Sequence, residues 1–325
     1  MRAGEWWEFK LAPILAAFYA TALMLQLPVA PLWRTALTIL LALVPGAAYV
    51  SVINDLTDRD EDLAVGKPNR MAGRSRGYAA ALIAITAGAG LAFCLLWRRD
   101  TLLLSLYLAA WVAFSLYSIP PFRWKTRGIF GVLCDAGGAH LFPTLVAVVL
   151  TFRDADRPVS VPWVAAVGAW AFANGIRGIL LHQLTDLEHD RQAGVRTFAQ
   201  RHPPAVTVRL GTFIVFPIEV AALAALLWQM RSTWPIAALA GYALIALLRV
   251  MQWRKNAVIV APKPRSMIVL HEYYDAWLPT AVLVASALRH PLDFVVLGLH
   301  LLVFPARVRQ VLRDAHALLR DARGS

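Results

Sequence analysis

The side chains best suited to chemistry in this sequence form two carboxylate clusters, each directly after an apolar run. The first is Asn54-Asp55-Leu56-Thr57-Asp58-Arg59-Asp60-Glu61-Asp62. On a helix, Asn54, Asp58 and Asp62 are spaced i, i+4 and i+8, with Asp55 beside them, so one amide and three carboxylates share about one face. Carboxylates this close repel each other, and a divalent cation that bridges them to a phosphorylated ligand relieves the repulsion. Mg²⁺ is the expected cofactor, because it prefers oxygen ligands and combines carboxylates with substrate phosphates.

The second cluster, Asp186-Leu187-Glu188-His189-Asp190, again places carboxylates at i and i+4 after an apolar run. A simpler interpretation of either cluster alone is a solvated helix end whose acids are favoured by the helix dipole. The repetition at two membrane exits favours a site that clamps a diphosphate.

Basic side chains that could neutralise a diphosphate follow the first cluster and one other apolar run. Lys67 and Arg70 come shortly after the acids. In the stretch Tyr117-Ser118-Ile119-Pro120-Pro121-Phe122-Arg123-Trp124-Lys125, two prolines end the helix, which leaves Tyr117 at its end and two cations in the loop. Cations that contact a leaving diphosphate stabilise the charge as it develops. Ordinary cytoplasmic charge and snorkelling cations are the open alternatives.

Polar residues also lie inside the apolar run before the second cluster. Asn174 and Arg177 are one to two helical turns deeper than His182, which shares a helix face with the cluster's aspartates. Ionisable groups at that depth are costly and usually face a cavity or a partner. We therefore expect these three residues to line a cavity or acceptor site. The alternative for Arg177 is a structural ion pair with Asp135 or Glu219.

Late in the chain, His271-Glu272-Tyr273-Tyr274-Asp275 places His271 and Asp275 at i and i+4. This pair could orient an acceptor or act as a base, and a hydrogen-bonded structural pair is an equally good interpretation. The stretch is not a HExxH zinc motif, because the second histidine is missing.

The elements that must position these residues are membrane helices. Of the 325 residues, 59% are hydrophobic and 16% are charged, whereas soluble domains are nearer half apolar and a quarter charged. Repeated apolar runs of about 20 residues predict an all-α polytopic transmembrane bundle of about nine helices. The expected spans are 10–28, 33–53, 78–97, 101–121, 131–151, 161–181, 206–229, 233–251 and 267–288. The apolar piece 291–306 is short for a span, and a tenth helix, the tail of a broken ninth or an interfacial segment all fit it.

The distribution of Lys and Arg predicts the orientation. Most of those outside the spans lie in four long loops, 54–77, 122–130, 182–205 and 252–266. The positive-inside rule places these loops and both acidic clusters in the cytoplasm. The net charge of +12 thus reflects topology, phosphate binding and contact with membrane lipids, and we expect no nucleic acid. We expect one domain over 1–325 with a basic cytoplasmic tail over 306–325, although a cytoplasmic tail requires an even number of crossings and so conflicts with nine spans.

With these residues assembled, the chain resembles the UbiA superfamily of integral-membrane prenyltransferases. Asn54-Asp55-x-x-Asp58-x-x-x-Asp62 matches that family's first aspartate-rich motif, and Asp186-x-x-x-Asp190 followed by Arg191 and Gly194 matches the second. The stretch from Tyr117 to Lys125 looks like the loop between the fourth and fifth helices in the chlorophyll-synthase-like and archaeal-lipid branches. The chain departs from the pattern at His182-Gln183, where many members carry Asn-Asp.

The resemblance implies a helical bundle around a lipid-open central cavity, with Mg²⁺ held through a diphosphate. The catalytic, metal-binding residues would be Asp55, Asp58, Asp62, Asp186 and Asp190. The diphosphate-binding residues would be Asn54, Lys67, Arg70, Tyr117, Arg123, Lys125 and Arg191. The residues facing the acceptor or cavity would be Asn174, Arg177, His182, His271 and Asp275.

We therefore predict Mg²⁺-dependent transfer of a prenyl group from an isoprenoid diphosphate to an acceptor, at the cytoplasmic face of the inner membrane. Three alternatives are open. One is a membrane terpene cyclase that uses the same clamp without an acceptor. Another is a polyprenyl-phosphate sugar transferase of the phosphoribosyl type. The third is a binding or transport protein without chemistry.

Overall fold

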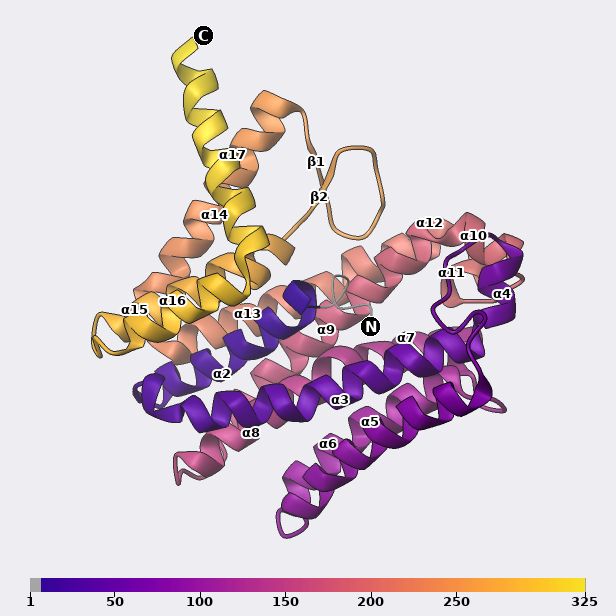
Figure 1. Ribbon diagram of the computed structural model, residues 1–325. Coiled ribbons are helices and arrows are strands. Elements are labelled where there is room, and N and C mark those ends of the chain that lie inside the picture. The colour runs from indigo at the N-terminus through magenta and orange to yellow at the C-terminus, as the bar shows by residue number, and fades with distance from the viewer. Residues whose placement is uncertain (1–6, 325) are drawn as a thin grey trace.

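The computed structural model describes residues 7–324, and these are almost entirely helical (Figure 1). Within this range, seven helices are long and apolar enough to cross a membrane, or eight if a bent pair near the C-terminus counts as one span. The seven are Ala30–Thr57, Arg76–Leu96, Thr101–Ser118, Ile129–Asp154, Val161–Thr185, Pro204–Met230 and Thr233–Trp253. The predicted all-α membrane bundle is confirmed, and the count of nine helices is approximate.

The elements follow one another with short connections. In chain order they are η1 (Trp7–Leu11), α2 (Ala12–Met24), η2 (Ala30–Leu32), α3 (Trp33–Thr57), α4 (Arg59–Ala64), α5 (Arg76–Leu96), α6 (Thr101–Ser118), η3 (Trp124–Thr126), α7 (Ile129–Ala136), η4 (Gly137–Leu141), α8 (Phe142–Asp154), α9 (Val161–Thr185), α10 (Leu187–Gln192), α11 (Phe198–Arg201), α12 (Pro204–Arg209), η5 (Leu210–Val215), α13 (Phe216–Met230), α14 (Thr233–Trp253), β1 (Asn256–Val258), β2 (Ser266–Ile268), η6 (Tyr273–Trp277), α15 (Leu278–Ala287), α16 (Asp293–Val303) and α17 (Pro305–Gly324).

The first and ninth predicted spans differ most from expectation. The span predicted at 10–28 is α2. The span predicted at 267–288 is η6 and α15, and the helical part starts later than predicted because the first residues belong to β2, which pairs in parallel with β1. Neither is among the seven long apolar helices. Both still belong to the bundle, because α2 packs against α8, α13 and α15 and is buried along nearly its whole length.

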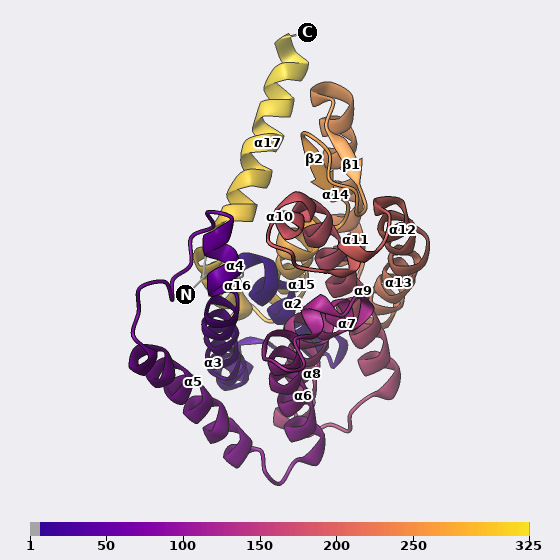
Figure 2. The same cartoon turned by 90° about the vertical axis from the view of Figure 1, so that its right-hand side faces the viewer.

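The predicted piece 291–306 is α16 together with the start of α17, and these two helices meet at an angle of 88°. The predicted tail 306–325 forms most of α17, which extends from the bundle beside α14 in both views (Figures 1 and 2). An ion pair of 2.9 Å between Arg249 and Asp314 links these two helices.

Proline explains four local distortions in the helices. The π turns η1, η4, η5 and η6 each run directly into an α-helix whose second residue is proline, namely Pro13, Pro143, Pro217 and Pro279. Proline lacks the backbone N–H and its ring clashes with the carbonyl four residues earlier. A turn that widens to i→i+5 bonding relieves this clash, and such turns are a known cause of bends.

Close packing between α5 and α6 gives a testable prediction about stability. Gly90 lies against the indole of Trp111, and a Cβ built on it would lie 2.4 Å from the ring. Gly90→Ala should therefore displace Trp111 and lower the midpoint of thermal unfolding by several degrees, measured in detergent by tryptophan fluorescence.

The matched control is Gly88→Ala on the same helix, where a Cβ meets no atom within 4 Å. There the higher helix propensity of alanine should leave the midpoint unchanged or raise it. If Gly90→Ala behaved like Gly88→Ala, the packing of α5 against Trp111 would be wrong.

Candidate functional site

The two acidic clusters adopt the same local backbone. α3 ends at Thr57 and α4 starts at Arg59, so the helix breaks at Asp58. In the second cluster α9 ends at Thr185 and α10 starts at Leu187, with the break at Asp186. The N–H of each aspartate at the break donates to the carbonyl four residues earlier, at 2.9 Å in both cases.

Both short helices also end in the same way. Gly66 and Gly194 follow α4 and α10 with φ values of 72° and 70°, a left-handed conformation that glycine adopts most easily at a helix end. Each motif therefore orients its carboxylates by a helix break, at Asp58 or Asp186, and by a glycine four residues after its last aspartate, at which the short helix ends. α4 and α10 lie at the same end of the bundle in both views (Figures 1 and 2).

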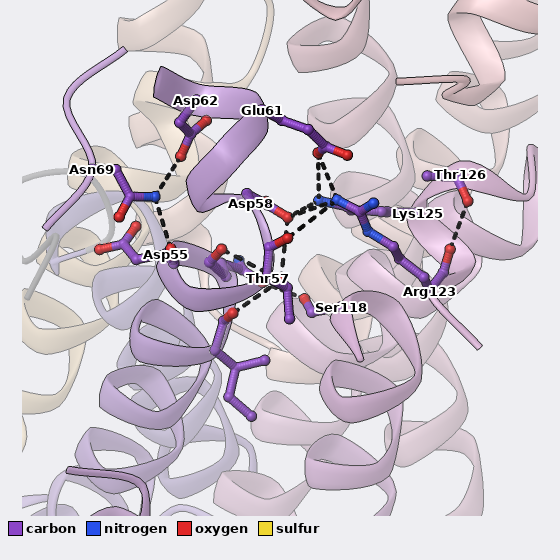
Figure 3. A network of polar contacts seen from close by, with 12 residues as sticks. Asp55, Thr57, Asp58, Glu61, Asp62, Asn69, Ser118, Arg123, Lys125 and Thr126 are labelled. Atoms are coloured by element: carbon purple, nitrogen blue, oxygen red, sulfur yellow. Dashed lines mark hydrogen bonds and ion pairs between the residues drawn. The ribbon is translucent and has the colours of Figure 1, made fainter. Parts of the chain in front are cut away.

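The basic loop after α6 contacts the first cluster directly (Figure 3). Lys125 is buried and donates a short hydrogen bond to Asp58. Arg123 donates to Asp58 at 3.2 Å and to Glu61 at 2.5 Å. Arg123 has a φ of 39°, a left-handed conformation unusual for a residue with a side chain. The turn it makes brings both cations onto the same two acids.

On the other side of α4, Asn69 holds the remaining acids in place (Figure 3). Its side-chain amide donates to the Asp55 carbonyl at 2.7 Å and to the Asp62 carboxylate at 2.9 Å. Asp55 itself is buried. Ser118, at the end of α6, donates a short hydrogen bond to the side-chain oxygen of Asn54.

The second cluster faces the first, because Lys67 donates to Asp186 at 3.4 Å across the space between them. His182 lies 3.6 Å from the same carboxylate, and Thr197 donates to Asp190 at 3.3 Å. Burial raises the pKa of Asp190, and the charge of Asp186 raises it further, whereas the hydrogen bond from Thr197 lowers it. A cation between these carboxylates would favour their charged forms.

A cavity of about 440 Å³ lies between the two clusters. Most of the residues predicted to bind the diphosphate or the metal line it, namely Asn54, Asp58, Asp62, Lys67, Arg70, Tyr117, Lys125, Asp186 and Asp190. His182, predicted to face the acceptor or the cavity, lines it too. Three predicted residues do not. Asp55 lies beneath the lining, Arg123 reaches it only through its acidic partners, and Arg191 is paired with Glu188 at 2.9 Å and lines a neighbouring hollow.

An apolar chamber of about 160 Å³ continues from this cavity into the bundle. Asn54 and Tyr117 line both spaces, so they mark the junction. The chamber lies among η1, α2, α3, α6, α7, η4 and α8, and three aromatic rings, those of Tyr107, Trp111 and Phe114, form part of its wall.

The deep polar residues that we expected to face an acceptor lie elsewhere. Arg177 is fully buried and forms a two-pronged ion pair with Glu219 at 2.6 and 2.7 Å. Tyr274 donates to the same glutamate at 2.8 Å. An ion pair with Glu219 was one of the two structural alternatives that the sequence analysis gave for Arg177. Asp275 pairs with Arg307 at 3.6 Å. The linings of the cavity and the chamber include none of Asn174, Arg177, His271 or Asp275 within the described range.

The donor set fits Mg²⁺ only together with a ligand. Among residues 7–324, no group of three or more His, Cys, Asp or Glu side chains is arranged to hold a metal by itself. The carboxylates instead line opposite sides of one cavity. Mg²⁺ typically keeps waters and binds one or two carboxylates plus substrate phosphates, which suits this arrangement.

Sequence reasoning did not assign Glu61, Asn69 or Ser118 to the site. A signal was present for two of them. Glu61 is three residues from Asp58 and so reaches the same cation, and Asn69 stands between Lys67 and Arg70. The partnership of Ser118 with Asn54 depends on how α3 packs against α6, and no local pattern reports it.

Comparisons with known proteins agree with this arrangement. The sequence profile of the UbiA prenyltransferase family matches residues 12–266. Lycopene elongase/hydratase of Haloarcula japonica is 31% identical over 160 residues, which is 48% of this chain and 50% of that protein. A chloroplastic 2-acylphloroglucinol 4-prenyltransferase of Humulus lupulus is 29% identical over 235 residues, 69% of this chain and 55% of that protein. This chain thus spans about half the length of the curated relatives it matches.

Among solved structures, a UbiA homolog from Archaeoglobus fulgidus has a similar fold. Its complex with DMAPP and Mg²⁺ has a TM-score of 0.56 at 17% identity, covering 85% of this chain and 96% of that one. Its complex with GPP and Mg²⁺ has a TM-score of 0.52 at 18% identity, with 90% and 96% coverage.

The buried ion pair predicts a large effect of a single substitution on stability. Arg177→Met leaves Glu219 charged, buried and without its main partner, which typically costs about 3–5 kcal/mol. We expect a marked fall in the midpoint of denaturant unfolding. The double variant Arg177→Met/Glu219→Gln should recover much of the loss, because it removes the unpaired charge.

If Arg177 contacts the acceptor instead, the outcome differs. Arg177→Met would then fold with normal stability and lose activity, and the double variant would recover no stability.

Proposed function

This chain belongs to the UbiA prenyltransferase family, and we propose that it transfers a prenyl group from an isoprenoid diphosphate to an acceptor at the cytoplasmic face of a membrane. One observation carries the proposal: two equivalent acidic motifs face each other across a cavity, which a basic loop closes and an apolar chamber continues. A polar head with two negative phosphates fits the first space, and a hydrocarbon chain fits the second.

Mg²⁺ would be held by Asp58 and Asp62 on one side and by Asp186 and Asp190 on the other, with Asp55 beneath them. When bound, it neutralises charge on the diphosphate and makes that group a better leaving group. The Archaeoglobus complexes, whose names include both Mg²⁺ and a prenyl diphosphate, support this assignment.

The chain's own cations would bind the diphosphate. Lys125 and Arg123 form ion pairs with Asp58 and Glu61, and Lys67 forms one with Asp186. The acids of both clusters would hold Mg²⁺, and Lys125, Arg123 and Lys67 would hold the oxygens of the diphosphate. This arrangement leaves few charges unpaired and so lowers the electrostatic cost of binding. Lys125, Arg123 and Tyr117 would then stabilise the charge that develops as the C–O bond breaks.

The apolar chamber would receive the prenyl chain. The carbon bonded to the diphosphate oxygen would lie at the junction marked by Asn54 and Tyr117. Rings along the wall, including Trp111 and Phe114, can stabilise an allylic cation through their π faces and exclude water.

The acceptor differs among the named relatives, since one name specifies lycopene and another 2-acylphloroglucinol. The function proposed here therefore stops at the reaction type. The positive-inside pattern of the long loops supports a cytoplasmic-membrane location with the site on the cytoplasmic face.

The central role of Asp58 gives a direct test. Asp58→Asn should lower Mg²⁺-dependent release of diphosphate by about 100-fold or more, because the variant loses one metal-facing charge at the point of bond cleavage. Release is measured with purified protein in nanodiscs, with dimethylallyl, geranyl and farnesyl diphosphates, each with and without candidate acceptors.

Asp60→Asn is the matched control on the same short helix. The Asp60 side chain is 89% exposed, and its one ion pair within residues 7–324 is with its neighbour Arg59, so its removal should leave release unchanged. Full activity of Asp58→Asn would contradict the proposal. Release in the wild type that yields hydrocarbon without an acceptor would instead favour a cyclase.

A further inference from the structure

Several charged side chains in the interior of this bundle are paired with one another or with backbone groups. Arg177 pairs with Glu219 at 2.6 Å, and Arg249 pairs with Glu272 at 2.7 Å. Asp293 accepts two backbone hydrogen bonds, at 2.7 and 2.9 Å. This pattern is expected, because a buried charge without a partner is costly.

Lys10 and Asp135 are exceptions. Both line the apolar chamber and both are only partly buried. Neither forms a hydrogen bond or ion pair with any residue in the described range 7–324, and they are not paired with each other. Lys10 comes from η1 and Asp135 from α7. Two different elements thus place opposite charges on the wall of one mostly apolar cavity.

The position of Asp135 relates this pair to the clamp. The chamber meets the diphosphate cavity at Asn54 and Tyr117, and the Asp135 carboxylate is close enough for its charge to act on Tyr117. The reacting carbon of a prenyl diphosphate would lie at this junction. An acceptor must reach the same place, so part of it would lie near Asp135.

We propose that Lys10 and Asp135 are the polar contacts of the acceptor site. The acceptor is an amphipathic molecule whose apolar body lies in the chamber beside the prenyl chain, with a hydroxyl that donates to Asp135 and an oxygen that faces Lys10. A pure hydrocarbon would leave both charges without partners in an apolar cavity, whereas a hydroxylated molecule satisfies them. The proposal rests on the prenyl-transfer function, because it assigns the second substrate of that reaction.

The test compares two probes, 4-octylphenol and its methyl ether 4-octylanisole. In the ether, a methyl group replaces the hydroxyl proton, so only the phenol can donate a hydrogen bond. Binding is followed by tryptophan fluorescence of the full chain in nanodiscs. Trp111 lines the chamber, so Trp111→Phe identifies the part of the signal that comes from it. The wild type should bind the phenol about tenfold more tightly than the ether, because a hydrogen bond to a charged acceptor is strong.

Substitutions of Asp135 and Lys10 should change the preference for the phenol over the ether by different amounts. Asp135→Asn should reduce it and Asp135→Leu should abolish it, since the amide is a weaker acceptor and leucine accepts no hydrogen bond. Lys10→Met should weaken phenol binding severalfold. Asp60→Asn and Lys263→Met change exposed charges of the same types elsewhere and should match the wild type.

Equal binding of both probes by the wild type would overturn the proposal, and so would a preference that survives in Asp135→Leu. Mg²⁺-dependent binding of geranyl thiolodiphosphate, a donor analogue that resists cleavage, is measured in the same samples. The Asp135 variants should retain it. Its absence in the wild type would overturn the prenyl-transfer function itself, whereas loss of the hydroxyl preference alone overturns only the acceptor site.

Discussion

Repulsion among carboxylates is the constraint on which this site depends. Two motifs bring acids from the helix breaks at Asp58 and Asp186, and from α4 and α10, to opposite sides of one cavity. Lys125, Arg123 and Lys67 offset that repulsion through their ion pairs with these acids. The same cations suit a diphosphate and the same acids suit Mg²⁺. A bound diphosphate could therefore take the place of the acids beside the cations, and a bound Mg²⁺ could take the place of the cations beside the acids. These ion pairs hold the cations beside the cavity that the diphosphate would enter.

The bundle positions this clamp through breaks in its helices. Asp58 and Asp186 stand where long helices stop and short ones begin, and each short helix ends at a left-handed glycine. Elsewhere, widened turns before Pro13, Pro143, Pro217 and Pro279 adjust the helices. Two of these widened turns, η1 and η4, border the apolar chamber, and η1 carries Lys10. Irregular backbone therefore coincides with the functional spaces.

Much of this was predictable from the sequence, because apolar length and i, i+4 spacing are local signals. Periodicity and charge were enough to predict the helical class. They were also enough to put Asp58 and Asp62 on one side of a helix and Lys125 in the loop after the fourth span. The partner of Arg177 was narrowed to two acids, and only packing of α9 against α13 selects Glu219. The sequence predicted a span ending at residue 53, whereas α3 continues to Thr57 and the helix breaks at Asp58, a backbone bend that residue spacing does not encode. Ser118 contacts Asn54 across the packing of α3 against α6, so no local pattern reveals its role.

The central claim is that the two clusters bind metal jointly and through the diphosphate. The most direct measurement is electron paramagnetic resonance of Mn²⁺, used in place of Mg²⁺, with and without geranyl thiolodiphosphate. We predict tight Mn²⁺ binding only when the analogue is present, and its loss when either Asp58 or Asp186 is changed to Asn. Mn²⁺ that binds equally well without the analogue, or that survives substitution in one cluster, would contradict the account.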